Sequence, residues 1–93
     1  MDSKLEFDVN PDGPISVYVQ IQNQIMFAIV SGRVKPGEQL PSVREMSARL
    51  NVNSNTVTKA YRDLVLKNLV QTRRGIGVTV TDEAVGKCKA FET

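Results

Sequence analysis

Residues 42–65 read SVREMSARLNVNSNTVTKAYRDLV, a pattern that indicates two helices joined by a short turn. Ser42 followed three positions later by Glu45 fits a capping box, in which the two residues satisfy each other's backbone N–H groups at a helix start. The pattern therefore predicts a helix of roughly two turns from this point. Its apolar residues share one helical face, and they are Val43, Met46 and Leu50.

A three-residue turn, residues 51–53, ends this helix. Asparagine tolerates the left-handed backbone that a sharp turn between helices needs, and Val52 can fill the core between the helices. A longer helix restarts at Ser54, capped by Asn53 or by Ser54 itself. Its inward stripe is apolar (Val57, Ala60, Tyr61, Leu64 and Val65), and its outward side is polar and basic (Asn55, Thr58, Lys59 and Arg62).

A first helix is expected upstream, where the folded domain begins near Ile15. Ser16 is a candidate cap and Gly32 is a natural stop. The apolar residues at helical spacing are Tyr18, Ile21, Ile25, Ala28 and Ile29. The second half of this helix is apolar almost all round, which leaves two interpretations: a centrally buried helix, or contact of Phe27 or Val30 with a second subunit or a later helix.

Two β-prone runs, residues 69–72 and 78–81, follow the longer helix and are separated by a glycine-containing connection. Glycine permits the positive φ of a hairpin turn, so a two-stranded ribbon is predicted. Arg73 and Arg74 lie at its tip. Residues 82–87 can open a further, marginal helix.

One more turn is expected between the first two helices. Proline presets φ and glycine adds freedom beside it in residues 35–38, so this segment is predicted to be a turn. Gln39 and Leu40 after it can form a very short strand.

Composition excludes several classes of function. The 93 residues contain no histidine, no tryptophan and a single cysteine, Cys88, which excludes a disulfide framework, Cys/His zinc sites and Ser-His or Cys-His nucleophiles. No apolar run approaches the ~20 residues of a membrane span, and the N-terminus lacks the order of a signal peptide. We therefore expect a cytoplasmic chain that is not an enzyme, needs no metal or other cofactor and does not enter a membrane.

Charge is distributed unevenly along the chain. Residues 33–74 carry nine Lys or Arg against three Asp or Glu, a net charge of +6, whereas residues 1–32 carry −3 and residues 75–93 carry −1. A basic middle suits a polyanion such as nucleic acid, and a solvated basic surface is an equal alternative.

The order of elements predicts an α+β fold, a winged helix-turn-helix with a three-helix core and a two-stranded hairpin wing, which a short C-terminal helix can follow. An α-helix fits the major groove of B-DNA, so outward side chains near the start of the longer helix are placed to read bases. Asparagine can pair with adenine, lysine with guanine, and threonine can touch the thymine methyl. The candidates are Asn55, Thr58 and Lys59; a solvated polar helix face is the alternative.

Arginines supply further candidate contacts. Arg44, in the first turn of the shorter helix, can reach a phosphate or a base edge, or pair with Glu45 or another carboxylate. Arg73 and Arg74 suit a wing that lies along the minor groove or the phosphates; an ordinary hairpin with solvated arginines is the alternative. Arg62 lies further along the longer helix, so we expect phosphate contact or no role.

Three motifs follow one another along the chain: LPSVRE at residues 40–45, NSNTVTKAY at residues 53–61 and Gly-Ile-Gly at residues 75–77. Across residues 14–81 the chain resembles the DNA-binding domain of GntR-family bacterial transcription regulators, and the NTVTKAY run most resembles the YtrA-type subfamily. The resemblance implies operator DNA contacts at the matching positions, which are Arg44, Ser54, Asn55, Thr56, Thr58, Arg73, Gly75 and Gly77.

The chain departs from the family pattern in two places. Asn51 stands where the turn usually has glycine, and asparagine is acceptable in the left-handed conformation. Many relatives carry arginine in the helix positions of Ser54 and Thr58, so the resemblance implies an operator different from theirs.

The expected organisation is a flexible arm over residues 1–13, a DNA-binding domain over residues 14–81, and over residues 82–93 the truncated start of a C-terminal helical or dimerisation extension. The expected function is a sequence-specific repressor that binds an inverted-repeat operator in double-stranded DNA as a homodimer. Two alternatives stay open: a winged-helix module that binds proteins, and the N-terminal DNA-binding piece of a larger fused regulator. No residue identifies a small-molecule effector, so the effector stays open.

Overall fold

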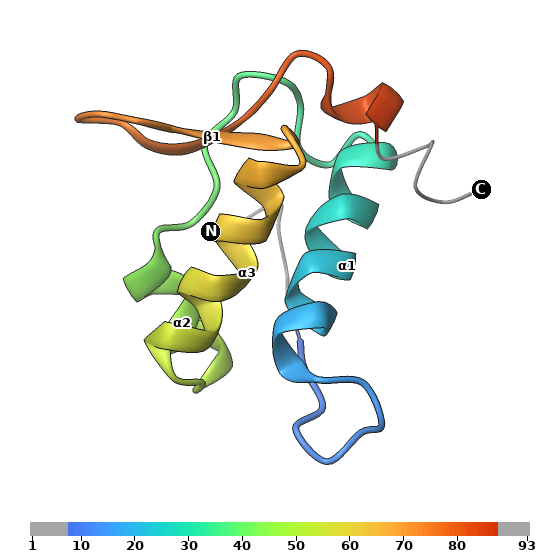
Figure 1. The fold of residues 1–93 in the computed structure, drawn as a ribbon, viewed down its shortest axis with the longest axis vertical. Coiled ribbons are helices and arrows are strands. Elements are labelled where there is room, and N and C mark those ends of the chain that lie inside the picture. The colour runs from blue at the N-terminus through green and yellow to red at the C-terminus, as the bar shows by residue number, and fades with distance from the viewer. Residues whose placement is uncertain (1–7, 88–93) are drawn as a thin grey trace.

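The computed structural model describes residues 8–87, and residues 1–7 and 88–93, including Cys88, lie outside this description. Three helices precede an antiparallel hairpin (Figure 1). The elements are α1 (Val17–Val30), α2 (Val43–Leu50), α3 (Ser54–Leu66), β1 (Val70–Arg73) and β2 (Gly77–Val80). The predicted α+β winged helix-turn-helix is therefore confirmed.

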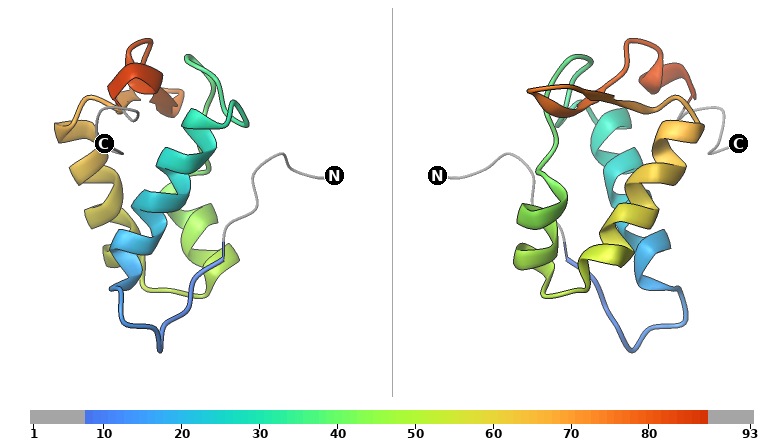
Figure 2. Two further views of the ribbon diagram at one scale, coloured as in Figure 1. Left: turned by 90° about the vertical axis from the view of Figure 1, so that its right-hand side faces the viewer. Right: turned by 60° about the vertical axis from the view of Figure 1, so that its left-hand side comes forward.

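Helix α1 lies along α3, and the two helices are joined by a polar contact as well as by apolar side chains (Figures 1 and 2). The buried Gln22 amide Nε2 donates to the Asp63 carboxylate at 3.1 Å and to the Ala60 carbonyl at 3.3 Å. Hydrogen-bonding partners on α3 offset the cost of burying this amide. The contact therefore ties the middle of α1 to the second half of α3.

The ends of α1 differ from each other. Ser16 occupies the N-cap position, but its side chain makes no capping hydrogen bond. At the other end Gly32 has φ +83°, as expected for a glycine stop. Phe27 is 57% exposed and the Arg33 guanidinium lies 5.7 Å from its ring centroid, so α1 is not buried all round.

Caps set the bounds of α2 and α3. The capping box is present: the Glu45 N–H donates to Ser42 Oγ at 3.0 Å, and the Ser42 N–H donates to Glu45 Oε1 at 3.2 Å. Asn51 closes α2 in the left-handed conformation, with φ 55° and ψ 48°. Asn53, not Ser54, caps α3, because its side-chain Oδ1 accepts from the Asn55 N–H at 2.8 Å.

The hydrophobic core lies where the three helices meet the base of the hairpin. Ile25 of α1, Met46 of α2 and Leu64 of α3 are fully buried at its centre. Burying one such side chain contributes about 1.5–3 kcal/mol. The other core residues are Ile21, Ala28, Ile29, Val34, Leu40, Val57, Ala60, Tyr61, Leu69, Val70, Val80 and Ala84.

The first strand begins one residue later than the predicted run at residues 69–72, and the second strand begins and ends one residue earlier than the run at 78–81. Leu69 belongs to the exit from α3, because its N–H donates to the Leu64 carbonyl at 3.0 Å. The register pairs Arg73 with Gly77 at the tip. The expected short strand near Gln39 is present as a single bridge to Thr79.

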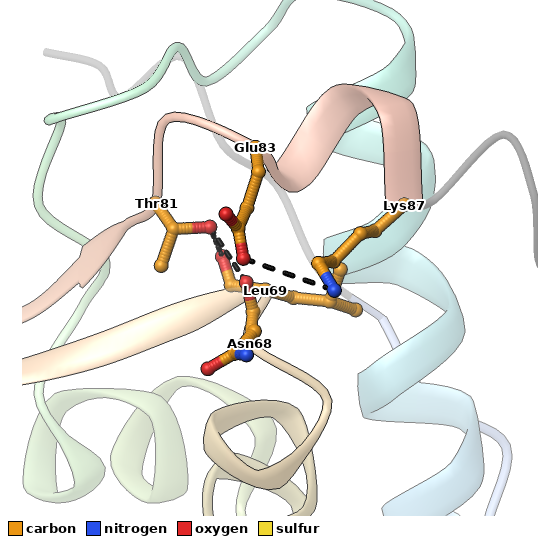
Figure 3. A network of polar contacts seen from close by, with 5 residues as sticks. All are labelled: Asn68, Leu69, Thr81, Glu83 and Lys87. Atoms are coloured by element: carbon orange, nitrogen blue, oxygen red, sulfur yellow. Dashed lines mark hydrogen bonds and ion pairs between the residues drawn. The ribbon is translucent and has the colours of Figure 1, made fainter.

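The segment after β2 is anchored to the exit from α3 (Figure 3). The Thr81 hydroxyl lies 2.7 Å from the Asn68 carbonyl and 3.3 Å from the Leu69 carbonyl, and it donates to them. Residues 84–87 then form a helical turn, with Lys87 Nζ 3.8 Å from the Glu83 carboxylate. Its Ala84 is fully buried, so this turn packs on the core.

The described part of the expected N-terminal arm, residues 8–13, runs back beside α1 (Figure 2). The Asn10 N–H donates to Gln20 Oε1 at 2.7 Å, and Gln20 Nε2 donates to the Asn10 carbonyl at 2.9 Å. Gln24 makes the same pair of contacts with the backbone N–H and carbonyl of Asp8. Two glutamine side chains thus hold this segment through its backbone.

Residues 8–87 offer neither a membrane-spanning helix nor a cluster of metal ligands. None of the helices there has both the length and the apolar character that a membrane crossing requires. No group of three His, Cys, Asp or Glu side chains in this part of the chain could hold a metal ion.

The position of the α3 cap can be tested by mutation. Asn53→Ala should lower the free energy of unfolding by about 1 kcal/mol, because the first turn of α3 loses its side-chain acceptor. Ser54→Ala, the matched control, should change it by less than about 0.5 kcal/mol. Urea unfolding followed by circular dichroism measures both values; a larger loss in Ser54→Ala would contradict the assignment.

Candidate nucleic-acid interface

Helix α3 is divided lengthwise into a buried and an exposed face. Its inward residues, including Val57 and Leu64, are fully buried in the core. Thr56 at its first turn is half-buried. The outward residues predicted as DNA contacts are exposed, and they are Ser54, Asn55, Thr58, Lys59 and Arg62. The structure therefore presents a continuous polar and basic surface on the helix that a winged helix-turn-helix uses for recognition.

Lys59 has a contact that the sequence pattern did not reveal. Its ammonium Nζ lies 4.2 Å from the ring centroid of Tyr18, in the first turn of α1. This distance is within the range of a cation–π interaction. The Lys59 head group is therefore placed between α3 and α1.

Arg44 lies in the first turn of α2 and is exposed. The neighbouring Glu45 carboxylate accepts from the Ser42 N–H, because it belongs to the capping box. Within residues 8–87, Arg44 makes no ion pair, so the predicted alternative of a pair with Glu45 is not observed. Its guanidinium remains available for a ligand.

The wing projects beyond the helices on the side of the molecule where α2 lies, with α1 on the opposite side (Figure 1). Arg73 ends β1 and Arg74 opens the turn, and both side chains are exposed. Gly75 has φ +79° and Gly77 has φ +118°, which L side chains rarely adopt. The two predicted wing glycines therefore shape the turn that carries the arginines.

The linker before α2 is fixed to α3 by a buried hydrogen bond. The Tyr61 hydroxyl donates to the Pro41 carbonyl at 2.7 Å. Burial raises the pKa of Tyr61 well above its ordinary value; the charge of Arg49 opposes this rise and that of Glu45 adds to it. Sequence reasoning placed Tyr61 in the core but missed its hydroxyl partner, which is 20 residues away.

A model of bacterial regulatory proteins of the gntR family matches residues 17–80, more than half of the chain. The chain belongs to the GntR family. It is 37% identical to the transcriptional repressor YtrA of Bacillus subtilis over 82% of the chain and 58% of that protein. The GntR chain thus spans less than two thirds of the length of this curated relative.

The solved structures that resemble this GntR chain include a transcription factor and a DNA-binding domain in complex with DNA. YtrA from Sulfolobus acidocaldarius is 32% identical, with a TM-score of 0.76 over 90% of this chain and 75% of that one. The DNA-binding domain of AraR in complex with operator ORX1 is 29% identical, with a TM-score of 0.70 over 83% of this chain and 96% of that one. The predicted GntR and YtrA-like resemblance is confirmed, and the proteins that the chain matches are regulators of transcription, as expected, and not enzymes.

The buried hydroxyl of Tyr61 predicts a pH dependence of stability. The unfolded chain releases the phenolic proton near pH ~10, whereas the folded chain retains it, so the free energy of unfolding should fall as the pH rises above about 10. Tyr61→Phe should be less stable by about 0.5–1.5 kcal/mol at neutral pH, because the Pro41 carbonyl loses its donor.

Between about pH 9 and pH 11 the variant should lose less stability than the wild type, since it has no phenol to ionise. Urea unfolding of both proteins across this range measures the difference. Parallel pH profiles would contradict the role assigned to the Tyr61 hydroxyl.

Proposed function

We propose that this GntR chain binds an operator as a sequence-specific repressor, with α3 in the major groove and the hairpin wing on the adjacent minor groove or phosphates. The observation that carries the proposal is that α3 exposes a polar and basic face while the projecting wing carries the exposed Arg73 and Arg74 at its tip. The likeness to a DNA-binding domain in complex with its operator supports this placement.

Base readout is assigned to the start of α3. Asn55 can pair bidentately with adenine, and the Thr58 methyl can contact a thymine methyl. Ser54 and Thr56 flank Asn55 at the N-terminal end of the helix, where polar side chains and backbone N–H groups suit phosphate oxygens.

Phosphate and wing contacts are assigned to basic residues. Arg44, Arg62 and the wing arginines are exposed and make no ion pair within residues 8–87, so their charges are available to the duplex. The Lys59 ammonium would either move away from the Tyr18 ring to reach a base, or remain on the ring and contact the DNA backbone. The segment that contains these residues, 33–74, carries the net charge of +6.

The assembly and organisation follow from the same proposal. Residues 14–81 act as the DNA-binding unit, residues 1–13 as its arm, and residues 82–93 as the start of a dimerising extension. The regulator acts in the cytoplasm as a homodimer on an inverted repeat, because twofold protein symmetry requires a palindromic site. The B. subtilis relative is named a repressor, which supports the sign of regulation.

Two substitutions test the assigned contacts. Arg44→Ala and Asn55→Ala should each weaken operator binding by about 1–3 kcal/mol if each reads a base. A phosphate contact by Arg44 would instead weaken binding to all sequences and reduce the log–log salt slope by about 1. Fluorescence anisotropy with labelled duplexes at several salt concentrations distinguishes these outcomes.

Arg33→Ala is the charge-matched control, because Arg33 lies in the loop after α1 and stacks on Phe27. It should leave operator affinity within about twofold of the wild type. Unchanged affinity in both Arg44→Ala and Asn55→Ala would contradict the assigned interface.

Selection from a random duplex pool at near-physiological salt tests specificity and symmetry together. We expect an enriched inverted repeat with half-sites about one helical turn apart. A single enriched half-site would contradict the homodimer and retain base readout. Absence of enrichment, with only weak salt-sensitive binding, would contradict sequence-specific binding and favour a protein-binding module.

A further inference from the structure

The linker between α1 and α2 runs along β2 at the base of the wing, like a short third strand. The Leu40 N–H donates to the Val78 carbonyl at 2.8 Å, and the Val80 N–H donates to the Glu38 carbonyl at 3.0 Å. The Gly37 N–H donates to the Val80 carbonyl at 2.8 Å. These backbone contacts hold β2 from Val78 to Val80 and do not reach the turn.

The side chain of Gln39 extends the contact between the linker and the hairpin as far as the turn of the wing. Its Nε2 donates to the Ile76 carbonyl at 2.5 Å, although Gln39 itself is opposite Thr79 in the sheet. A Cβ on Gly77 would lie 3.1 Å from this same Nε2, tighter than ordinary contact. The missing side chain of Gly77 therefore leaves the space through which Gln39 reaches the turn.

The other end of the same short segment is fixed to the recognition helix. Pro41, two residues after Gln39, accepts the buried hydrogen bond from the Tyr61 hydroxyl of α3. Leu40 between them is fully buried in the core. Residues 39–41 thus connect the turn of the wing to the middle of α3 within three residues.

We infer that Gln39 is a positioning residue that holds the turn of the wing at a set place relative to α3, so that the wing and the recognition helix meet one duplex together. The inference rests on the proposed function. Two glycines of positive φ make the turn conformationally permissive, and an ordered turn spares the entropy that binding would otherwise have to remove. Arg74, in that turn, is the side chain that gains from this order.

The test compares Gln39→Leu, which keeps the side-chain size and removes the donor, with Gln71→Leu. Gln71 is exposed and also lies opposite Thr79, so it shares the sheet face of Gln39. In the free proteins, heteronuclear NOE values at residues 74–77 should fall in Gln39→Leu and stay at wild-type level in Gln71→Leu. Thermal unfolding confirms that each variant is folded; Gln39→Glu, which also lacks the donor, replaces Gln39→Leu in this measurement if that variant is unfolded.

Operator binding by Gln39→Leu should weaken by roughly two- to tenfold, the range for one lost hydrogen bond. In an Arg74→Ala background the same substitution should weaken binding by less than twofold, because the side chain that Gln39 positions is gone. A purely structural role would give the same factor in both backgrounds. Gln71→Leu should leave affinity unchanged.

The outcomes separate this inference from the proposed function. Unchanged NOE values in Gln39→Leu, a mobile wing with unchanged affinity, or equal factors in the two backgrounds would each overturn the role of Gln39 while operator binding stands. Absence of duplex binding by the wild type would overturn the proposed function and the DNA part of this inference. The NOE values would then still decide whether Gln39 orders the wing.

Discussion

The left-handed backbone of Asn51 makes the sharp turn that brings α2 and α3 together. It ends α2 and lets the chain reverse within three residues before α3 begins. Because α2 and α1 both pack on α3, the inward face of α3 is fully occupied by the core. The side that carries Asn55 and Thr58 is left in solvent as a consequence, so the exposed polar face of this helix is set by what covers its opposite face.

The features that the sequence predicted well are those determined by near neighbours. The capping box at Ser42, the left-handed Asn51 and the glycine stop at Gly32 each depend on residues within four positions, and each occurs in the structure. The apolar stripe of α3 was also predicted, because a period of 3.6 residues is visible in a single helix. The predicted strand bounds were wrong by one residue. Leu69 does not begin β1, because its N–H donates to the Leu64 carbonyl at the end of α3.

The contacts that sequence reasoning missed join residues far apart in the chain. Gln39 reaches a carbonyl 37 residues away, and Gln22 reaches a carboxylate 41 residues away. Lys59 meets Tyr18 on another helix. None of these pairs produces a periodic or local pattern in the sequence. A polar side chain could bond to many different groups, and only the folded structure determines which of them lies beside it. The candidate interface was therefore predictable as a face, and the individual partners of its side chains were not.

The contact between α1 and residues 8–10 has a wider meaning for the arm. Gln20 and Gln24 are one helical turn apart, a rise of about 6 Å, and alternate residues of an extended chain are separated by about 6.6 Å. Each glutamine amide can therefore meet the N–H and carbonyl of every second residue, as Asn10 and Asp8 do here. The side chains of α1 thus bond to the backbone of this segment as the edge strand of a sheet would. Because only backbone N–H and carbonyl groups are used, any residue type except proline could stand at positions 8 and 10.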